Sequence, residues 1–183
     1  GYPEGRDPAT GRRLVLNLEL GLTDTDFRES TELFIDFMDK IGVVIRPCYN
    51  NKPTFFEKVE RRQAQMFRLS WFADYPDAEN FLQLFYGPNA SPGSNRSNYV
   101  NPGYDALYER ARTMQDSDAR TDLYRAMARQ VVEDCPWIFM HHPVDYSLSQ
   151  PWVENFFPHD FPYGMEKYYR LNADRRARPG WRD

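Results

Sequence analysis

The sequence predicts an α/β fold in which helices flank a mixed central β-sheet. Three observations support this. Short apolar, partly β-branched stretches alternate with amphipathic stretches over the first 72 residues, in the order strand, helix, strand, helix, strand. Two longer amphipathic stretches with helix-start residues follow between 101 and 135. A chain of 183 residues that is 41% hydrophobic and 16% aromatic can also bury a core, which argues against disorder.

The first half of the chain contains five expected elements. A Gly-, Pro- and Arg-rich opening loop over 1–13 leads into the first strand at 14–20. The spacing of apolar residues predicts a helix from Asp26 to Lys40, with Asp26 as its cap and Gly42 as its stop. The remaining elements are expected to be a strand at 43–46, a helix at 53–60 with Phe56 and Val59 inward, and a strand at 66–72.

The second half begins with a polar loop over 87–102, whose length is typical of a functional or mobile segment. Asn101-Pro102 opens one helix and Ser117-Asp118 opens another, which ends before Pro136. Strands are expected at 137–141, 146–149 and 167–171, and the charged tail at 174–183 is expected to fray.

Composition and motif spacing exclude several functions. The balance of 23 Lys+Arg against 27 Asp+Glu lacks the basic excess of a non-specific nucleic-acid binder, so no nucleic-acid partner is expected. His141 and His142 would point to opposite faces of a strand and His159 stands alone, so no metal site is expected. The sequence has no nucleotide-binding glycine motif, and no nucleophile elbow accompanies His141, Asp145 and Ser147. Neither a cofactor nor a catalytic residue is therefore expected.

The two cysteines, Cys48 and Cys135, each lie beside an apolar segment. We expect both to be free and mostly buried, with a bonded or reactive pair as the alternative. No apolar run is long enough to cross a bilayer. Because the chain opens at Gly1 rather than Met, we expect it to be a processed or excised piece.

Carboxylates gather directly after the third expected strand. Asp77 and Glu79 are expected to cap a helix over 78–85, although with Asp74 they could also form the acid and base of a hydrolase. Asp74 lies at the strand mouth beside Trp71 and Tyr75, a setting suited to binding a cation. The alternative for Asp74 is a turn-forming residue bonded to its own backbone.

Arg68 lies three residues before Trp71 on the same expected strand. It is either a solvated strand charge or a partner for a ligand carboxylate.

The stretch Trp71–Leu82 resembles the W-x-A-D-Y-P-D-x-x-N-F-L signature of the family-5 extracellular solute-binding proteins. These proteins are the dipeptide- and oligopeptide-binding components of bacterial ABC importers. The resemblance extends through Asn95–Leu107, Asp118–Pro136 and the opening loop, and so spans roughly 1–170.

The resemblance implies the second lobe of a type II periplasmic-binding-protein-like fold. Residues 1–150 would form this C-terminal lobe, and 151–183 would return toward a missing N-terminal lobe, ending in a partly disordered tail. The cleft between two lobes would capture a peptide-like solute for the permease subunits of an importer. The location would be periplasmic, or extracellular and membrane-anchored. Such a lobe alone would bind ligand weakly or not detectably, and 151–183 would be poorly anchored or packed on a neighbouring molecule.

The resemblance also assigns roles in the cleft. Asp74 would bind the α-ammonium group of the ligand, and the backbone of Trp71, Phe72, Ala73 and Asp74 would bind an extended peptide. Arg68 would reach the ligand carboxylate, and Tyr75 would line the site. The cargo stays open among dipeptides, oligopeptides, metal chelates and other amine-bearing solutes. The alternatives are a hydrolase using Asp74 with Asp77 or Glu79, and a protein-interaction module that binds no small ligand.

Overall fold

A computed structural model describes residues 1–22, 24–142, 144, 146–159, 161 and 164–176. The chain divides into two compact units, each of which is described by itself. The first unit comprises 1–72 and 78–137, and the second comprises 73–77 and 138–183.

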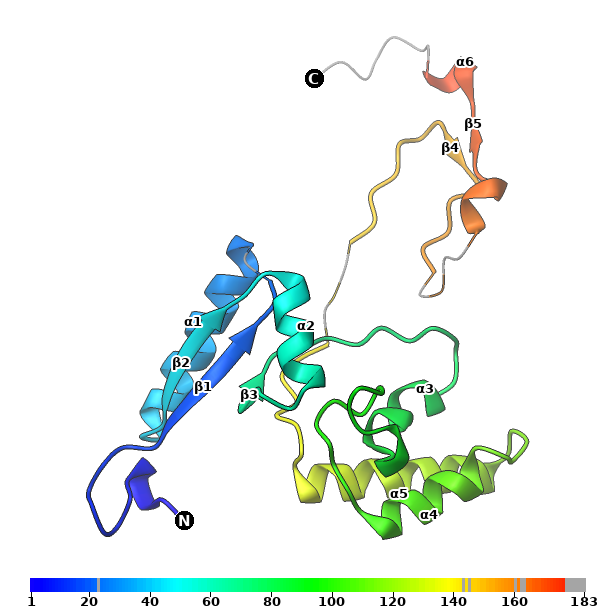
Figure 1. Ribbon diagram of the computed structural model, residues 1–183. Helices are drawn as coiled ribbons and strands as arrows, with labels where there is room; N and C mark the ends of the chain where they lie inside the picture. Colours follow the sequence, from blue (N-terminus) through cyan, green and yellow to red (C-terminus); the bar gives the residue numbers. More distant parts are fainter. Residues whose placement is uncertain (23, 143, 145, 160, 162–163, 177–183) are drawn as a thin grey trace. The chain divides into compact units, whose positions relative to one another are not determined.

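The first unit contains a parallel three-stranded sheet with the order β2-β1-β3 (Figure 1). Its strands are β1 (Val15–Leu20), β2 (Val44–Tyr49) and β3 (Met66–Phe67). The expected α/β class is therefore confirmed, although these three strands run in one direction. The expected strand at 66–72 is too long. β3 pairs only with Leu18 and Glu19, and β1 ends one residue later, which leaves the following residues without a partner strand.

Helix α1 (Thr25–Lys40) packs on one face of this sheet. Phe27, Phe34, Ile35 and Met38 meet a buried cluster formed by Leu18, Leu20, Val43 and Ile45. The expected cap was wrong by two positions, because Asp24, not Asp26, accepts the backbone N–H of Phe27 at 2.9 Å. Gly42 follows the helix with φ +85°, as its expected role as a stop requires.

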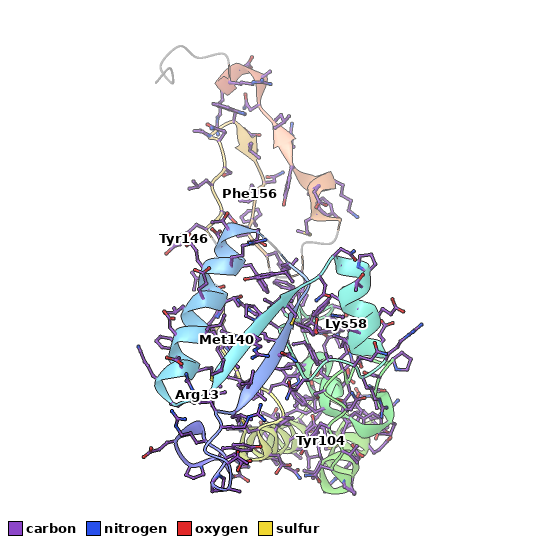
Figure 2. The ribbon with its side chains drawn as sticks, turned by 60° about the vertical axis from the view of Figure 1, so that its left-hand side comes forward. Arg13, Lys58, Tyr104, Met140, Tyr146 and Phe156 are labelled. Atoms are coloured by element: carbon purple, nitrogen blue, oxygen red, sulfur yellow. The ribbon has the colours of Figure 1, made fainter. Side chains whose placement is uncertain are left out.

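Helix α2 (Lys52–Glu60) carries Lys58, which Figure 2 labels. Lys58 bonds to Glu19, a β1 side chain that alternates with the buried Leu18 and Leu20 and so points to the opposite face of the sheet from α1. Asn51 caps α2 by accepting from the Thr54 N–H at 2.9 Å. The inward residues of α2 are Phe55 and Val59, so the expectation for Phe56 was wrong by one residue.

The rest of the first unit forms a second hydrophobic core. Its elements are α3 (Glu79–Leu82), the 3₁₀ turns Gln83–Phe85 and Gly87–Asn89, α4 (Pro102–Ala111) and α5 (Asp118–Asp134). The caps Asn101 and Ser117 are confirmed by side-chain hydrogen bonds to backbone N–H groups. Figure 2 labels one residue of this core, Tyr104. The buried residues of the core are Leu82, Leu84, Phe85, Tyr86, Tyr104, Tyr108, Ala111, Met127 and Val131.

The polar loop over 87–102 is held in place by a fully buried amide. Asn95 Nδ2 donates to the carbonyl groups of Tyr86 and Tyr99 at 3.1 and 2.8 Å, and Asn95 Oδ1 accepts from Ser97 Oγ and the Tyr99 N–H. The expectation of a mobile loop does not fit this hydrogen-bonded arrangement.

The second unit contains a two-stranded antiparallel ribbon formed by β4 (Val153–Glu154) and β5 (Arg170–Leu171). A 3₁₀ turn at Met165–Tyr168 precedes β5, and α6 (Ala173–Arg176) follows it. The expected strand at 167–171 is therefore reduced to its last two residues. The expected fraying beyond Arg176 lies outside the described residues.

Residues 138–150 form no strand where the structure describes them, so the strands expected at 137–141 and 146–149 were wrong there. They lack the neighbouring strand that an extended segment needs. Apolar side chains nevertheless recur at alternate positions and are exposed, among them Ile138, Met140, Val144, Tyr146 and Leu148. Figure 2 labels Met140 and Tyr146 in this segment.

Both cysteines are free. Cys135, the C-cap residue of α5, is exposed and Cys48 is half-buried, so their expected burial was wrong. Within the described ranges, none of the helices combines the length and the apolar character needed to span a bilayer.

Candidate ligand-binding site

The main chain leaves the sheet at the carboxyl end of β3, the edge where ligands bind in open α/β sheets. The Arg68 N–H makes the last bond to β1, donating to the Glu19 carbonyl at 3.2 Å. In the part of the chain that the structure describes, no partner bonds the backbone N–H and C=O groups of Leu69–Phe72. Unpaired main-chain groups of this kind can pair with another extended chain.

Trp71 is anchored to the second hydrophobic core. Its Nε1 donates to Asn80 Oδ1 at 2.8 Å, and Asn80 is fully buried. The neighbouring Phe72 is 74% exposed. The sequence analysis missed the role of Asn80, although its place in the motif nine residues after Trp71 was a usable signal.

Arg68 lies against the first turns of α1. Its Nη1 donates to Ser30 Oγ at 2.8 Å and to Thr31 Oγ1 at 3.0 Å, and its guanidinium carbon lies 4.3 Å from the centroid of the Phe27 ring. Burial lowers the pKa of Arg68, an effect that the nearby charge of Asp24 opposes. Because its guanidinium contacts these α1 side chains, Arg68 is not merely a solvated charge on a strand.

Ala73, Asp74 and Tyr75 belong to the second unit. Asp74 and Tyr75 are exposed and Ala73 is half-buried. Asp74 therefore does not lie in a dry interior, a position that would have prevented contact with a solute. Arg68, Trp71 and Phe72 therefore belong to the first unit, and the other three residues belong to the second.

Neither Asp77 nor Glu79 is the N-cap residue of α3, because Ala78 occupies that position and Glu79 lies in the first turn. The carboxylate of Glu79 instead accepts a hydrogen bond from the Tyr108 hydroxyl of α4. Glu79 therefore ties α3 to α4 within the second hydrophobic core.

A polar network at the carboxyl end of β1 was not foreseen. The nearly buried Glu19 accepts from Lys58 Nζ at 2.9 Å and from Asn50 Nδ2 at 2.7 Å. The isolated acid in the apolar strand Leu16–Leu20 was the available signal. Since Lys58 neutralises Glu19, this network fixes the strand ends in place and adds no net charge to the edge.

Among the described residues, no group of three or more His, Cys, Asp or Glu side chains could hold a metal ion. Of the three residues considered for nucleophilic catalysis, His141 and Ser147 are exposed, and Asp145 lies outside the described residues.

Comparison with known proteins relates the chain to a class of binding proteins, although no family model matches it. It is 24% identical to heme-binding protein A of Haemophilus influenzae over 174 residues, which cover 95% of this chain and 31% of that protein. It is 25% identical to di/tripeptide-binding protein 1 of Pseudomonas aeruginosa over 139 residues, which cover 74% of this chain and 25% of that protein. The solved unliganded open form of the murein tripeptide-binding protein MppA matches with a TM-score of 0.64 and 25% identity, over 72% of this chain and 25% of that one.

The chain is similar in sequence and fold to the family-5 extracellular solute-binding proteins. The resemblance inferred from the motif at Trp71–Leu82 is thus confirmed, as is the type II periplasmic-binding-protein-like fold. The chain spans about a quarter to a third of the length of these family-5 relatives. The relatives named here are binding proteins rather than enzymes, so the hydrolase is not favoured.

Proposed function

We propose that the chain is the ligand-binding lobe of the solute-binding component of an ABC importer, and that it captures a peptide-like solute. The observation that carries the proposal is the unpaired main chain of Leu69–Phe72 at the carboxyl end of the sheet. An extended peptide that pairs with such a segment gains main-chain hydrogen bonds, whatever its side chains are. The peptide-binding relatives support the same class of ligand.

In this proposal, charged residues bind the two ends of the ligand. Asp74 binds the α-ammonium group, and Arg68 binds the carboxylate. The backbone of Trp71, Phe72 and Ala73 pairs with the ligand main chain, and Tyr75 lines the site. Trp71 keeps the binding segment in place through its bond to Asn80.

A second lobe would close over this edge, and the loaded protein would deliver its solute to the permease subunits. Hinge closure of two lobes is a general means of enclosing a ligand. The corresponding location is the periplasm, or the outer face of the membrane through an anchor. A protein-interaction module without a small ligand is not favoured, because the relatives named above bind small solutes.

The role of Asp74 can be tested by titration calorimetry on the whole protein that carries this chain. The probes are trialanine and N-acetyl-trialanine. We expect Asp74→Asn to weaken trialanine binding by about 2–5 kcal/mol, roughly thirty-fold or more, because the ligand ammonium loses its partner. The acetylated peptide has no ammonium group, so its binding should change little.

Asp77→Asn is the matched control, since it removes a carboxylate three residues away and should leave both affinities unchanged. Equal trialanine affinity in wild type and Asp74→Asn would contradict the role of Asp74. Failure of the wild-type protein to bind any peptide would contradict the proposed function.

A further inference from the structure

We propose that Ser30 and Thr31 of α1 are positioning residues that orient Arg68, so that the site selects ligands with a free carboxylate. The inference rests on the proposed function, in which Arg68 binds that carboxylate. It concerns what holds the guanidinium in place before a ligand arrives.

The two hydroxyl groups are themselves fixed by the helix. Ser30 Oγ and Thr31 Oγ1 both donate to the Phe27 carbonyl, at 3.0 and 2.7 Å. With its proton used on the backbone, each hydroxyl offers a lone pair to Arg68 Nη1, at 2.8 and 3.0 Å. Nη1 also lies 3.4 Å from the Phe27 carbonyl oxygen. One helix turn therefore binds one end of the guanidinium.

The other edge of the guanidinium is left for a ligand. Arg68 Nε and Nη2 make no hydrogen bond with any described residue, and none of the described carboxylates forms an ion pair with Arg68. These two groups present parallel N–H bonds, which match the two oxygens of a carboxylate. Arg68 is therefore not ion-paired with any described carboxylate, and its side chain already has a fixed direction.

The hydroxyls are needed because the nearby charge of Asp24 favours the cation without fixing the direction of the guanidinium, and the helix dipole opposes the cation. Arg68 lies beside the N-terminal turns of α1, where the helix dipole disfavours positive charge. A free arginine would also lose rotamer freedom when it binds a ligand. The fully buried Thr31 and the stacked Phe27 ring remove much of that freedom beforehand, and such pre-organisation raises affinity.

The test compares trialanine with its C-terminal amide by titration calorimetry on the whole protein. Wild type should prefer the acid, and Arg68→Met should abolish the preference. The double variant Ser30→Ala/Thr31→Val keeps the charge but frees the side chain, so we expect the preference to fall by about ten-fold, a loss near 1.4 kcal/mol. Affinity for the amide should stay the same, which a merely structural role of the hydroxyls would not predict.

Two further variants sharpen the comparison. Ser30→Ala/Thr31→Ser keeps one of the two hydroxyls that the double variant lacks, and it should retain part of the preference. Thr121→Val is the matched control, because the Thr121 hydroxyl makes the same kind of bond in α5, to the Ser117 carbonyl at 3.2 Å, without an arginine. It should leave both affinities unchanged.

The outcomes separate the two proposals. If wild type prefers the acid and Arg68→Met loses the preference, an unchanged preference in the double variant overturns the positioning role while the proposed function stands. If wild type binds both peptides equally, Arg68 does not bind the carboxylate, and the inference is wrong although peptide binding survives. If neither peptide binds, the proposed function is contradicted and the positioning role with it.

A ligand-free measurement checks the contact itself. Urea denaturation of wild type, Arg68→Met, Ser30→Ala/Thr31→Val and their combination forms a double-mutant cycle. Non-additive shifts of the midpoint are expected if the hydroxyls hold Arg68. Additive shifts would overturn the inference independently of any peptide.

Discussion

At the scale of single residues, Asn95 makes four hydrogen bonds that hold the polar loop over 87–102. Its amide uses both donor and acceptor, and all of its partners belong to the loop or its flanks. Because Asn95 is fully buried, water cannot replace these bonds.

We therefore expect Asn95→Ala to lower the free energy of unfolding by about 2–4 kcal/mol, since it strands buried carbonyl groups of the loop. Urea denaturation followed by circular dichroism measures the change. Ser94→Ala removes one hydroxyl bond, to Gln83 Oε1 at 3.2 Å, and should have a much smaller effect. Equal effects for the two variants would show that Asn95 does not organise the loop.

The carboxylate of Asp134 gives the fold a defined response to pH. Hydrogen bonds from Tyr99 first, and then from Asn101, lower the pKa of Asp134. Burial first, and then the bond to Asp134, raise the pKa of Tyr99 to about 12, so the phenol stays protonated at neutral pH. A lowered carboxyl pKa contributes stability above its ordinary range, and this contribution is lost as the pH falls through the lowered value.

Accordingly, Tyr99→Phe should be less stable than wild type at neutral pH, and the difference should shrink as the pH falls below roughly 4. Thermal unfolding at a series of pH values gives the comparison. Tyr146→Phe alters a tyrosine that is 89% exposed, so its unfolding temperature should follow that of wild type across the pH series. Parallel curves for Tyr99→Phe as well would argue against the coupling to Asp134.

At the scale of elements, the start of α1 can be tested directly, because one acid, Asp24, is its N-cap and a second, Asp26, lies in its first turn. Asp24 makes the capping bond to the Phe27 N–H, and Asp26 lies in the first turn. We expect Asp24→Ala to lower the free energy of unfolding by about 1 kcal/mol and Asp26→Ala to change it by a few tenths at most. Urea denaturation distinguishes them, and the reverse order would restore Asp26 as the cap.

Elements specified by local chemistry could be predicted from the sequence. The helices α4 and α5 begin at the expected caps, because the capping bonds of Asn101 and Ser117 are accepted from backbone N–H groups within the next turn. Strand lengths could not be predicted, because pairing joins distant parts of the chain. The expected strand at 66–72 ends at Phe67 for this reason, and residues 137–149 carry a strand pattern without a described partner.

In the candidate site too, features set by neighbouring residues could be predicted, and features set by long-range packing could not. The sequence singled out Arg68 and Trp71 from their places beside a strand end. It could not identify Ser30 and Thr31, which lie 38 and 37 residues from Arg68 in the chain. The contact depends on how α1 packs on the sheet, and packing is not encoded in the spacing of residues.

At the scale of the whole molecule, the two units should differ in local stability. The first unit contains both hydrophobic cores, whereas the described residues of 138–150 form no helix or strand. In hydrogen–deuterium exchange, the amides of 138–142 should exchange within seconds, and those of α5 should be protected far longer. Residues 79–82 of the short helix α3 are a useful intermediate reference. Protection of 138–142 comparable to that of α5 would contradict this ranking.

The alternating apolar residues between Ile138 and Leu148 have a consequence for handling the protein. Exposed apolar side chains at alternate positions, such as Leu148 at 97% exposure, allow the segment to pair with copies of itself. Precipitation would then depend on protein concentration more than on temperature, because the folded cores need not open for it. Lysine at 146 and 148 would act as a gatekeeper and keep concentrated samples clear without touching either core.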